Sequence, residues 1–151
     1  MYSTILLLHL LGATIWTGGH LYLVLAILPQ ALKARAPERI LAFESSFERV
    51  GMSALLVQVA TGLWMAMKLQ PDLANWFTLA TPHAKLIMFK ITLLLLTVLT
   101  ALDVRLRIIP KLSPQTLPSL AVRIVFVTFL SVLFVVAGAS FRGALLFGLF
   151  L

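Results

Sequence analysis

The chain has 151 residues, 61% of them hydrophobic, and its mean hydropathy of +1.05 is far above that of a soluble domain of this size. Its 12 Lys and Arg residues against 5 Asp and Glu residues give a formal net charge of +7. The chain contains no cysteine, which excludes disulfides, thiolate metal sites and thiol redox chemistry. These properties indicate an all-α integral membrane protein.

Four apolar runs are long enough to cross a bilayer core of ~30 Å at a rise of ~1.5 Å per residue. They predict a four-transmembrane-helix antiparallel bundle in a single domain over residues 1–151. The first run has no Lys or Arg before it and is longer than a signal-peptide core, so we expect it to be retained as a helix. The expected spans are residues 4–28, 50–69, 85–102 and 120–141.

Basic residues gather at the ends of the spans, so their distribution indicates orientation and not nucleic-acid binding. They are concentrated in the first and third loops, and the N-terminal tail has none. The positive-inside rule therefore predicts that both termini and the second loop lie outside, which in a bacterial inner membrane is the periplasm. The basic residues of the two loops are Lys33, Arg35, Arg39, Arg49, Arg105, Arg107 and Lys111, with Arg123 at the next helix start.

The loops are predicted from prolines and from breaks in the apolar pattern. The first helix is expected to end at Pro29, because a proline pushes the residue before it out of the helical region. The first loop, Gln30 to Arg49, then carries the pattern of a short amphipathic helix on the cytoplasmic surface. In the second loop, Gln70 to Pro82, Trp76 suits a membrane-interface anchor. The third loop is expected from Asp103 to Pro118.

Two histidines, His9 and His20, lie in the otherwise apolar first span. They are eleven residues apart, so at ~100° per residue the two imidazoles point within ~20° of each other, at depths ~16 Å apart. Ionisable groups inside a membrane span are costly and usually face the protein interior or a cavity. We therefore expect the other helices to form a wall around this face of the first helix.

The predicted topology places His9 and His83 at similar depth in the outer half of the bundle. Two neutral imidazoles on different helices that face one cavity are a candidate axial pair for b-type haem. Three cations near the same boundary, Lys68, Lys85 and Arg142, are expected to pair with its two propionates. The alternative is that the histidines only form hydrogen bonds between packed helices.

Three further features leave alternatives open. His20 has no second histidine near its depth, so it is a proton-relay or quinone-site residue, a single metal ligand or a packing group. Lys90, inside the third span, either snorkels to the interface or has an interior role. Gly12, Gly18 and Gly19 suit either close helix packing or the flat face of a macrocycle.

Copper is a second class of ligand that the sequence permits. Met65, Met67 and Met88 fall in the outer half near His9 and His83, and thioether and imidazole groups suit Cu(I). Methionines are also common as core or lipid-facing residues of an apolar chain. Direct copper binding is therefore an alternative to haem.

Several motifs occur in order along nearly the whole chain. Together they resemble the CopD family of copper-resistance inner-membrane proteins, and the resemblance implies a role in copper uptake or tolerance. The motifs are His9-Leu-Leu-Gly-Ala-Thr-Ile-Trp16-Thr-Gly18-Gly19-His20, Phe47-Glu48-Arg49-Val-Gly51, Ala60-Thr61-Gly62-Leu-Trp64, Arg105-Leu-Arg107-Ile-Ile-Pro110 and Ser140-Phe141-Arg142.

Two stretches, one of them within the first motif, carry a more distant likeness. His9 followed after six residues by Trp16, and the run His83-Ala-Lys85-Leu86, are similar to HemJ-type protoporphyrinogen oxidases, four-helix membrane proteins that bind b haem. This likeness implies that His9 and His83 are haem ligands, with Trp16 and Lys85 in the functional site. The chain departs from the HemJ pattern at Leu102-Asp103, where a histidine is expected.

Three functions remain as hypotheses. The first is a membrane haem protein of electron transfer linked to copper homeostasis, with His9, His83 and His20 as the candidate metal ligands. The second is a copper transport component without haem, and the third is a HemJ-like oxidase, so enzymatic activity is left open. The expected partners are the lipid bilayer and a quinone or another redox partner, a homo-oligomer stays open, and no nucleic acid is expected.

Overall fold

The computed structural model describes residues 1–141, and all regular secondary structure in this part is helical. Four of its helices are long and apolar enough to cross a membrane. The expected all-α, four-transmembrane-helix architecture is therefore confirmed, and the chain is a multi-pass membrane protein. The four helices are Tyr2–Ala34, Glu38–Leu69, Pro82–Lys111 and Leu117–Ser140.

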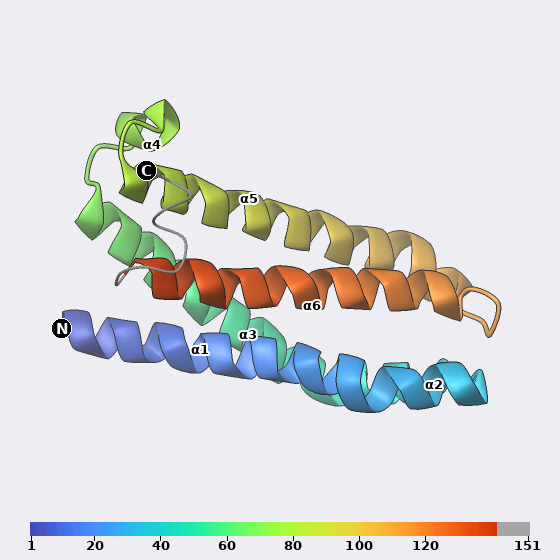
Figure 1. Ribbon diagram of the computed structural model, residues 1–151. Coiled ribbons are helices and arrows are strands. Elements are labelled where there is room, and N and C mark those ends of the chain that lie inside the picture. Colours follow the sequence, from blue (N-terminus) through green and yellow to red (C-terminus); the bar gives the residue numbers. More distant parts are fainter. Residues whose placement is uncertain (142–151) are drawn as a thin grey trace.

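The first and third of these helices are composite, whereas the second and fourth are continuous α-helices (Figure 1). Each composite helix contains one π-helical segment, η1 in the first and η2 in the third. In chain order the elements are α1 (Tyr2–Tyr22), η1 (Leu23–Ile27), α2 (Leu28–Ala34), α3 (Glu38–Leu69), α4 (Ala74–Thr78), α5 (Pro82–Asp103), η2 (Val104–Ile108), the 3-10 turn η3 (Ile109–Lys111) and α6 (Leu117–Ser140).

The helices pack in the order α3, α1, α6, α5. Helix α1 packs most extensively on α3 and also contacts α6, and α6 in turn packs on α5, whereas α3 and α5 make almost no close approach. In Figure 1, α6 lies between α5 and α1, and α3 passes behind. The end that contains the N-terminus, α4 and the start of α5 is here called the terminal end. The opposite end, with the turns after α2 and η3, is called the basic end.

Pro29 does not end the first helix, contrary to the expectation. The Leu28 N–H bonds the Leu23 carbonyl, five residues back, so a π-helical turn precedes the proline. A proline ring clashes with the carbonyl four residues before it, and the wider turn relieves this clash. The same device precedes Pro110, where the Ile109 N–H bonds the Val104 carbonyl. Both helices therefore continue into segments that were predicted to be loops.

The first loop is consequently a tight turn and not a long connection. Arg35 adopts a left-handed conformation with φ 51° and ψ 40°. Its N–H bonds the Leu32 carbonyl at 3.2 Å, and the Ala36 N–H bonds the Ala31 carbonyl at 2.9 Å, which is the Schellman arrangement of a helix end. Because α3 begins at Glu38, the expected separate amphipathic helix is the first part of a single 32-residue helix.

The main apolar core lies at the basic end. Aliphatic side chains from the first helix, from α3 and from α6 meet there, and partly buried residues of η2 pack against them. Burial of these side chains supplies the dominant favourable packing of this end. The buried members are Leu23, Leu28, Ala31, Ile40, Leu117, Leu120, Ala121 and Ile124.

The sequence predicted that Trp76 is a membrane-interface anchor, but the structure shows a buried side chain. Its side chain is only 4% exposed, and its indole Nε1–H donates to the Gln70 carbonyl at 2.8 Å. A buried indole needs an acceptor for its N–H, and here the acceptor is a carbonyl at the start of the same loop. The hydrogen bond therefore holds α4 to the residue that follows α3. The neighbouring Phe77 is 72% exposed and is the residue in a position to enter the membrane interface.

The three glycines of α1 have different surroundings. A Cβ at Gly12 would lie 2.9 Å from the Ala54 carbonyl oxygen, and one at Gly19 would overlap the ring of Phe47. These two glycines therefore permit the close approach of α1 and α3. Gly18 has nothing within 4 Å of the same position. Of the two roles left open for this glycine face, helix packing accounts for Gly12 and Gly19.

Candidate cofactor-binding site

His9 lies where α1 meets α3 in the terminal half of the bundle. Its Nδ1 is 2.9 Å from the hydroxyl oxygen of the buried Thr61, which lies in the last third of α3. A Cβ on the next residue, Gly62, would lie 3.0 Å from the His9 Cε1 atom. The imidazole therefore packs on α3 where Thr61 supplies a hydroxyl and Gly62, which has no side chain, leaves space for the ring.

The Thr61 hydroxyl also determines the tautomer of His9. Its single hydrogen is donated to helix carbonyls, chiefly that of Val57, one turn back. The hydroxyl oxygen can then only accept from His9, so Nδ1 carries the ring proton and Nε2 keeps its lone pair. An Nδ1–H bound to a neighbouring acceptor is the arrangement that orients an imidazole for ligation through Nε2.

His20 has the same tautomer further toward the basic end. Its Nδ1 lies 2.9 Å from the Trp16 carbonyl oxygen, and because a carbonyl can only accept, Nδ1 is the protonated nitrogen. The two rings are stacked at a tilt, with centroids 4.4 Å apart. Trp16 therefore supports His20 through its carbonyl and its ring. His20 is further tied to α6, because Thr128 donates to its backbone carbonyl at 3.4 Å.

On α5, His83 and Lys90 both face α6. The His83 ring stacks on Phe141, with centroids 6.3 Å apart, and the Lys90 ammonium lies 5.8 Å from the centre of the same ring. A Cβ at Gly138 would be 3.7 Å from the Lys90 Nζ. The Lys90 ammonium therefore lies between α5 and α6, near the terminal end of α6.

These residues lie in the same half of the bundle and are here called the terminal cluster: His9, Thr61, His83, Lys90 and Phe141. They come from α1, α3 and α5 and from the residue that follows α6. The ionisable members of the cluster are all bases. Among residues 1–141 no three or more His, Cys, Asp or Glu side chains converge as a metal-binding group, so any ligation here rests on one or two imidazoles.

The three cations predicted to pair with propionates have separate positions. Lys68 is exposed, with its Nζ 5.7 Å from the centre of the Trp64 ring, so it faces the interface at the rim of α3. Lys85 is half-buried, in the same first turns of α5 as His83. Arg142 lies outside the described residues. Lys90, which was not among the three, is a cation that lies within the terminal cluster.

The methionines do not point to one site. Met67 is 42% exposed, whereas Met65 and Met88 are half-buried on different helices. Direct copper ligation stays a prediction, with His9 and His83 as its strongest donors.

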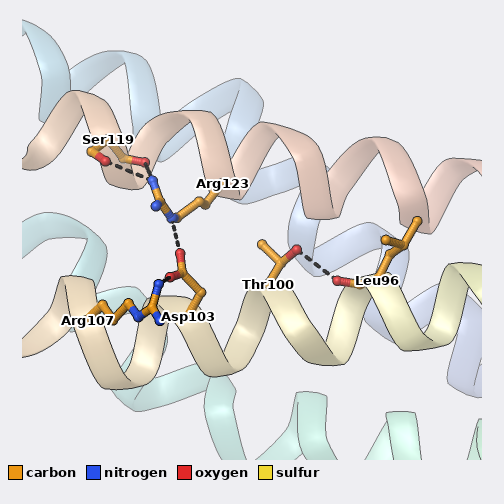
Figure 2. Close-up of polar contacts among 6 residues, drawn as sticks. All are labelled: Leu96, Thr100, Asp103, Arg107, Ser119 and Arg123. Atoms are coloured by element: carbon orange, nitrogen blue, oxygen red, sulfur yellow. Dashed lines mark hydrogen bonds and ion pairs between the residues drawn. The ribbon is translucent and has the colours of Figure 1, made fainter.

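A second polar group lies at the basic end, between α5 and α6 (Figure 2). The Arg123 Nε–H donates to Asp103, and its Nη1 donates to the carbonyl and the hydroxyl of Ser119 at 3.0 and 2.8 Å. Arg107 lies 3.6 Å from the other oxygen of Asp103. Arg49 is exposed on α3, and the neighbouring Glu48 pairs with Arg105 at 3.7 Å.

Comparisons of the chain with models of protein families, with curated proteins and with solved structures gave no match.

Sequence reasoning found the histidines but missed their partners. Thr61 is the residue that orients His9, and Phe141 is the ring that His83 and Lys90 share. The available signal was a polar residue between two small ones, Ala60 and Gly62, in the middle of a span. A small residue beside a hydroxyl leaves room for a bulky polar side chain of another helix.

Proposed function

We propose that this chain is a membrane haem protein of the CopD type that transfers electrons within a bacterial inner membrane and is linked to copper homeostasis. The observation that carries the proposal is the His9–Thr61 hydrogen bond. It favours the tautomer with the proton on Nδ1 and the lone pair on Nε2, and it lies inside a membrane span, where ionisable side chains usually serve a function.

The donor set suits a b-type haem. His9 on α1 and His83 on α5 belong to helices that make almost no close approach to each other. If His9 and His83 held the haem, each would bind the iron through a ring nitrogen, and the separation of their helices would leave room for the macrocycle. Two neutral nitrogen ligands are the set that holds low-spin haem in electron-transfer proteins.

The charges of the terminal cluster suit the carboxylates of such a group. Lys90 lies beside Gly138 and Phe141, and Lys85 lies about one and a half turns earlier on α5. An ammonium at a low-dielectric boundary is stabilised by an anionic partner. We assign the propionates to Lys85 and Arg142, as first predicted, with Lys90 in the place of Lys68.

When bound, the haem supplies a one-electron couple, and the protein sets its potential through the ligands and their surroundings. Thr61 fixes the tautomer and the rotation of His9. The apolar faces of the four helices exclude water. We propose a membrane quinone or another redox partner as the source or acceptor of the electron. We further propose that His20 binds a second ligand, deeper in the bundle, through its unprotonated Nε2.

The test is a visible spectrum of detergent-purified protein with and without dithionite. Bis-imidazole ligation gives sharp low-spin α and β bands in the reduced protein. His9→Ala and His83→Ala should each abolish these bands or convert them to a high-spin form, and His20→Ala should leave them in place, because His20 lies ~16 Å further along the helix. Loss of the bands with His20→Ala but not with His83→Ala would overturn the pairing.

The proposed orientation has both termini in the periplasm, since the basic turns after α2 and η3 mark the cytoplasmic side. A periplasm-active reporter fused to the C-terminus should be active. Activity from a cytoplasm-restricted reporter at the same position would reverse the orientation, while leaving the spectral test unaffected.

A further inference from the structure

The Asp103 network at the basic end lies under two adjoining grooves. The first, of about 370 Å³, runs between α5 and α6 and is lined by apolar residues above Asp103 and Arg123. The second, of about 300 Å³, runs along the other side of α5 above Asp103 and Arg107. Both grooves include Leu99 and Asp103, so they meet at the ion pair shown in Figure 2.

The walls of the grooves are apolar and face outward. Six of the lining residues are among the exposed large hydrophobic residues of the molecule, at 38 to 70%. On a transmembrane helix such side chains face hydrocarbon and not water. Each groove is therefore a channel along the helix surface that suits an acyl chain. The six residues are Leu96, Leu99, Leu102, Leu106, Val122 and Phe126.

The floor where the grooves meet carries an excess of positive charge. Two guanidiniums, Arg107 and Arg123, face the single carboxylate of Asp103, which leaves one charge uncompensated. The Arg107 side chain is 82% exposed, and its only ion pair within residues 1–141 is the 3.6 Å contact with Asp103. Guanidinium groups of this kind bind phosphate through paired N–H donors.

We propose that this face binds one anionic glycerophospholipid, with the phosphate on Arg107 and Arg123 and the two acyl chains in the two grooves. Three observations agree with this occupant. There are two grooves, and such a lipid has two acyl chains. The two grooves meet at one point, where Arg107 and Arg123 give an excess of positive charge, opposite in sign to the lipid headgroup. Basic pockets between transmembrane helices are known sites for anionic headgroups.

An uncharged isoprenoid quinone would also fill an apolar groove, but it would leave the excess charge unanswered. The lipid also accounts for the position of Asp103, Arg107 and Arg123 at the basic end. The basic end is where the headgroup region begins, because the turns after α2 and η3 lie there.

The test is native mass spectrometry of the full chain released from nanodiscs that contain equal amounts of phosphatidylglycerol and phosphatidylcholine. We expect one phosphatidylglycerol to be retained by the wild-type protein, with little phosphatidylcholine. Arg107→Gln should reduce retention about fivefold, as expected for one basic residue near the headgroup. Leu99→Trp, which fills both grooves without a change of charge, should reduce it as well.

Arg105→Gln is the matched control. Arg105 lies in the same π-helical segment and is also exposed, but it pairs with Glu48 of α3 on a different side. Retention should be unchanged in this variant. Equal retention of the two lipids, equal loss in both arginine variants, retention that survives Leu99→Trp, or a retained quinone in place of the lipid would each overturn the proposal. Inorganic phosphate added at millimolar concentration should not displace the lipid, since a free anion lacks the chains.

Discussion

The two ends of the bundle are built differently. At the basic end, aliphatic side chains from three helices form the core, and the polar residues are paired with each other, as Asp103 is with Arg123. In the terminal half, imidazoles, a lysine, a threonine and glycines lie between the helices beside buried apolar residues such as Ala84, Leu86 and Ala137, and the ionisable members of the terminal cluster are all bases. The comparison suggests that the basic end is the scaffold and that the terminal half is shaped for something other than packing.

The largest expected effect comes from removal of the hydroxyl that orients His9. Thr61→Val keeps the shape of the side chain but leaves Nδ1–H of His9 without its acceptor. Loss of such a partner costs about 10- to 100-fold in affinity of the ligated group. Haem retention should fall by this factor on titration of the purified apoprotein, and Thr61→Ser should restore most of it.

If Thr61→Val left retention unchanged, the hydrogen bond would be a packing contact, and the terminal half would lose its main distinction from the basic end. Thr97→Val is a suitable control, because Thr97 is also buried but bonds only to the Leu93 carbonyl of its own helix.

The next effect concerns the contact between α1 and α3. Gly12→Ala would place a Cβ 2.9 Å from a backbone oxygen of α3, which cannot move as a side chain can. We expect a loss of about 1 to 3 kcal/mol in the free energy of unfolding, as for other overpacked sites. Thermal unfolding in detergent, followed by circular dichroism, measures it.

Gly18→Ala is the matched control, since the corresponding position is open. It should be neutral or slightly stabilising, because alanine has the higher helix propensity. Equal destabilisation by both substitutions would mean that the α1–α3 contact is not as close as described.

At the basic end, Arg123→Gln should lower stability without a change in the haem spectrum. It leaves Asp103 with only the longer contact to Arg107. Breaking a fully buried pair costs several kcal/mol, but these side chains are 27% and 30% exposed, so we expect about 1 to 2 kcal/mol. The double variant Asp103→Asn, Arg123→Gln should recover part of the loss in the same unfolding measurement. A change in the haem spectrum of either variant would contradict this expectation and would show that the basic end affects the proposed haem site.

The smallest effect is a gain. Arg35 has a positive φ of 51°, which costs a non-glycine residue about 1 kcal/mol. Arg35→Gly should therefore stabilise the turn by up to about 1 kcal/mol, seen as a small rise in the unfolding midpoint. Arg35→Ala, which keeps the strain and removes only the charge, should give no such rise.

The sequence predicted the four spans because long apolar runs have few alternative structures in a membrane. It failed at their ends. The rule that a helix stops before a proline predicted loops after Pro29 and around Pro110, whereas π-helical turns carry both helices onward. A π-turn depends on the fit to neighbouring helices and has no sequence pattern that a single chain reveals.

The candidate site divides in the same way. The helical period placed His9 and His20 on one face of the first helix, and the structure shows the His9 ring against α3. On α5, the His83 ring and the Lys90 ammonium both lie against Phe141 at the end of α6. Period alone could not place Thr61 beside His9, because the rotation of α3 against α1 is set by Gly12 and Gly62. Whether His9 and His83 share one iron stays a prediction.

The two π-helical turns also determine how the two ends of each composite helix are rotated relative to one another. A π-turn holds one more residue than an α-turn within nearly the same rotation, so the segments before and after Leu23–Ile27 face the directions that a regular α-helix one residue shorter would give them. His9 and His20 precede that point, whereas Leu28 and Ala31 follow it in the core. A regular α-helix that kept every residue would turn everything after the segment by ~100°, and it could not present its histidines to the interior and bury its aliphatic residues at the same time.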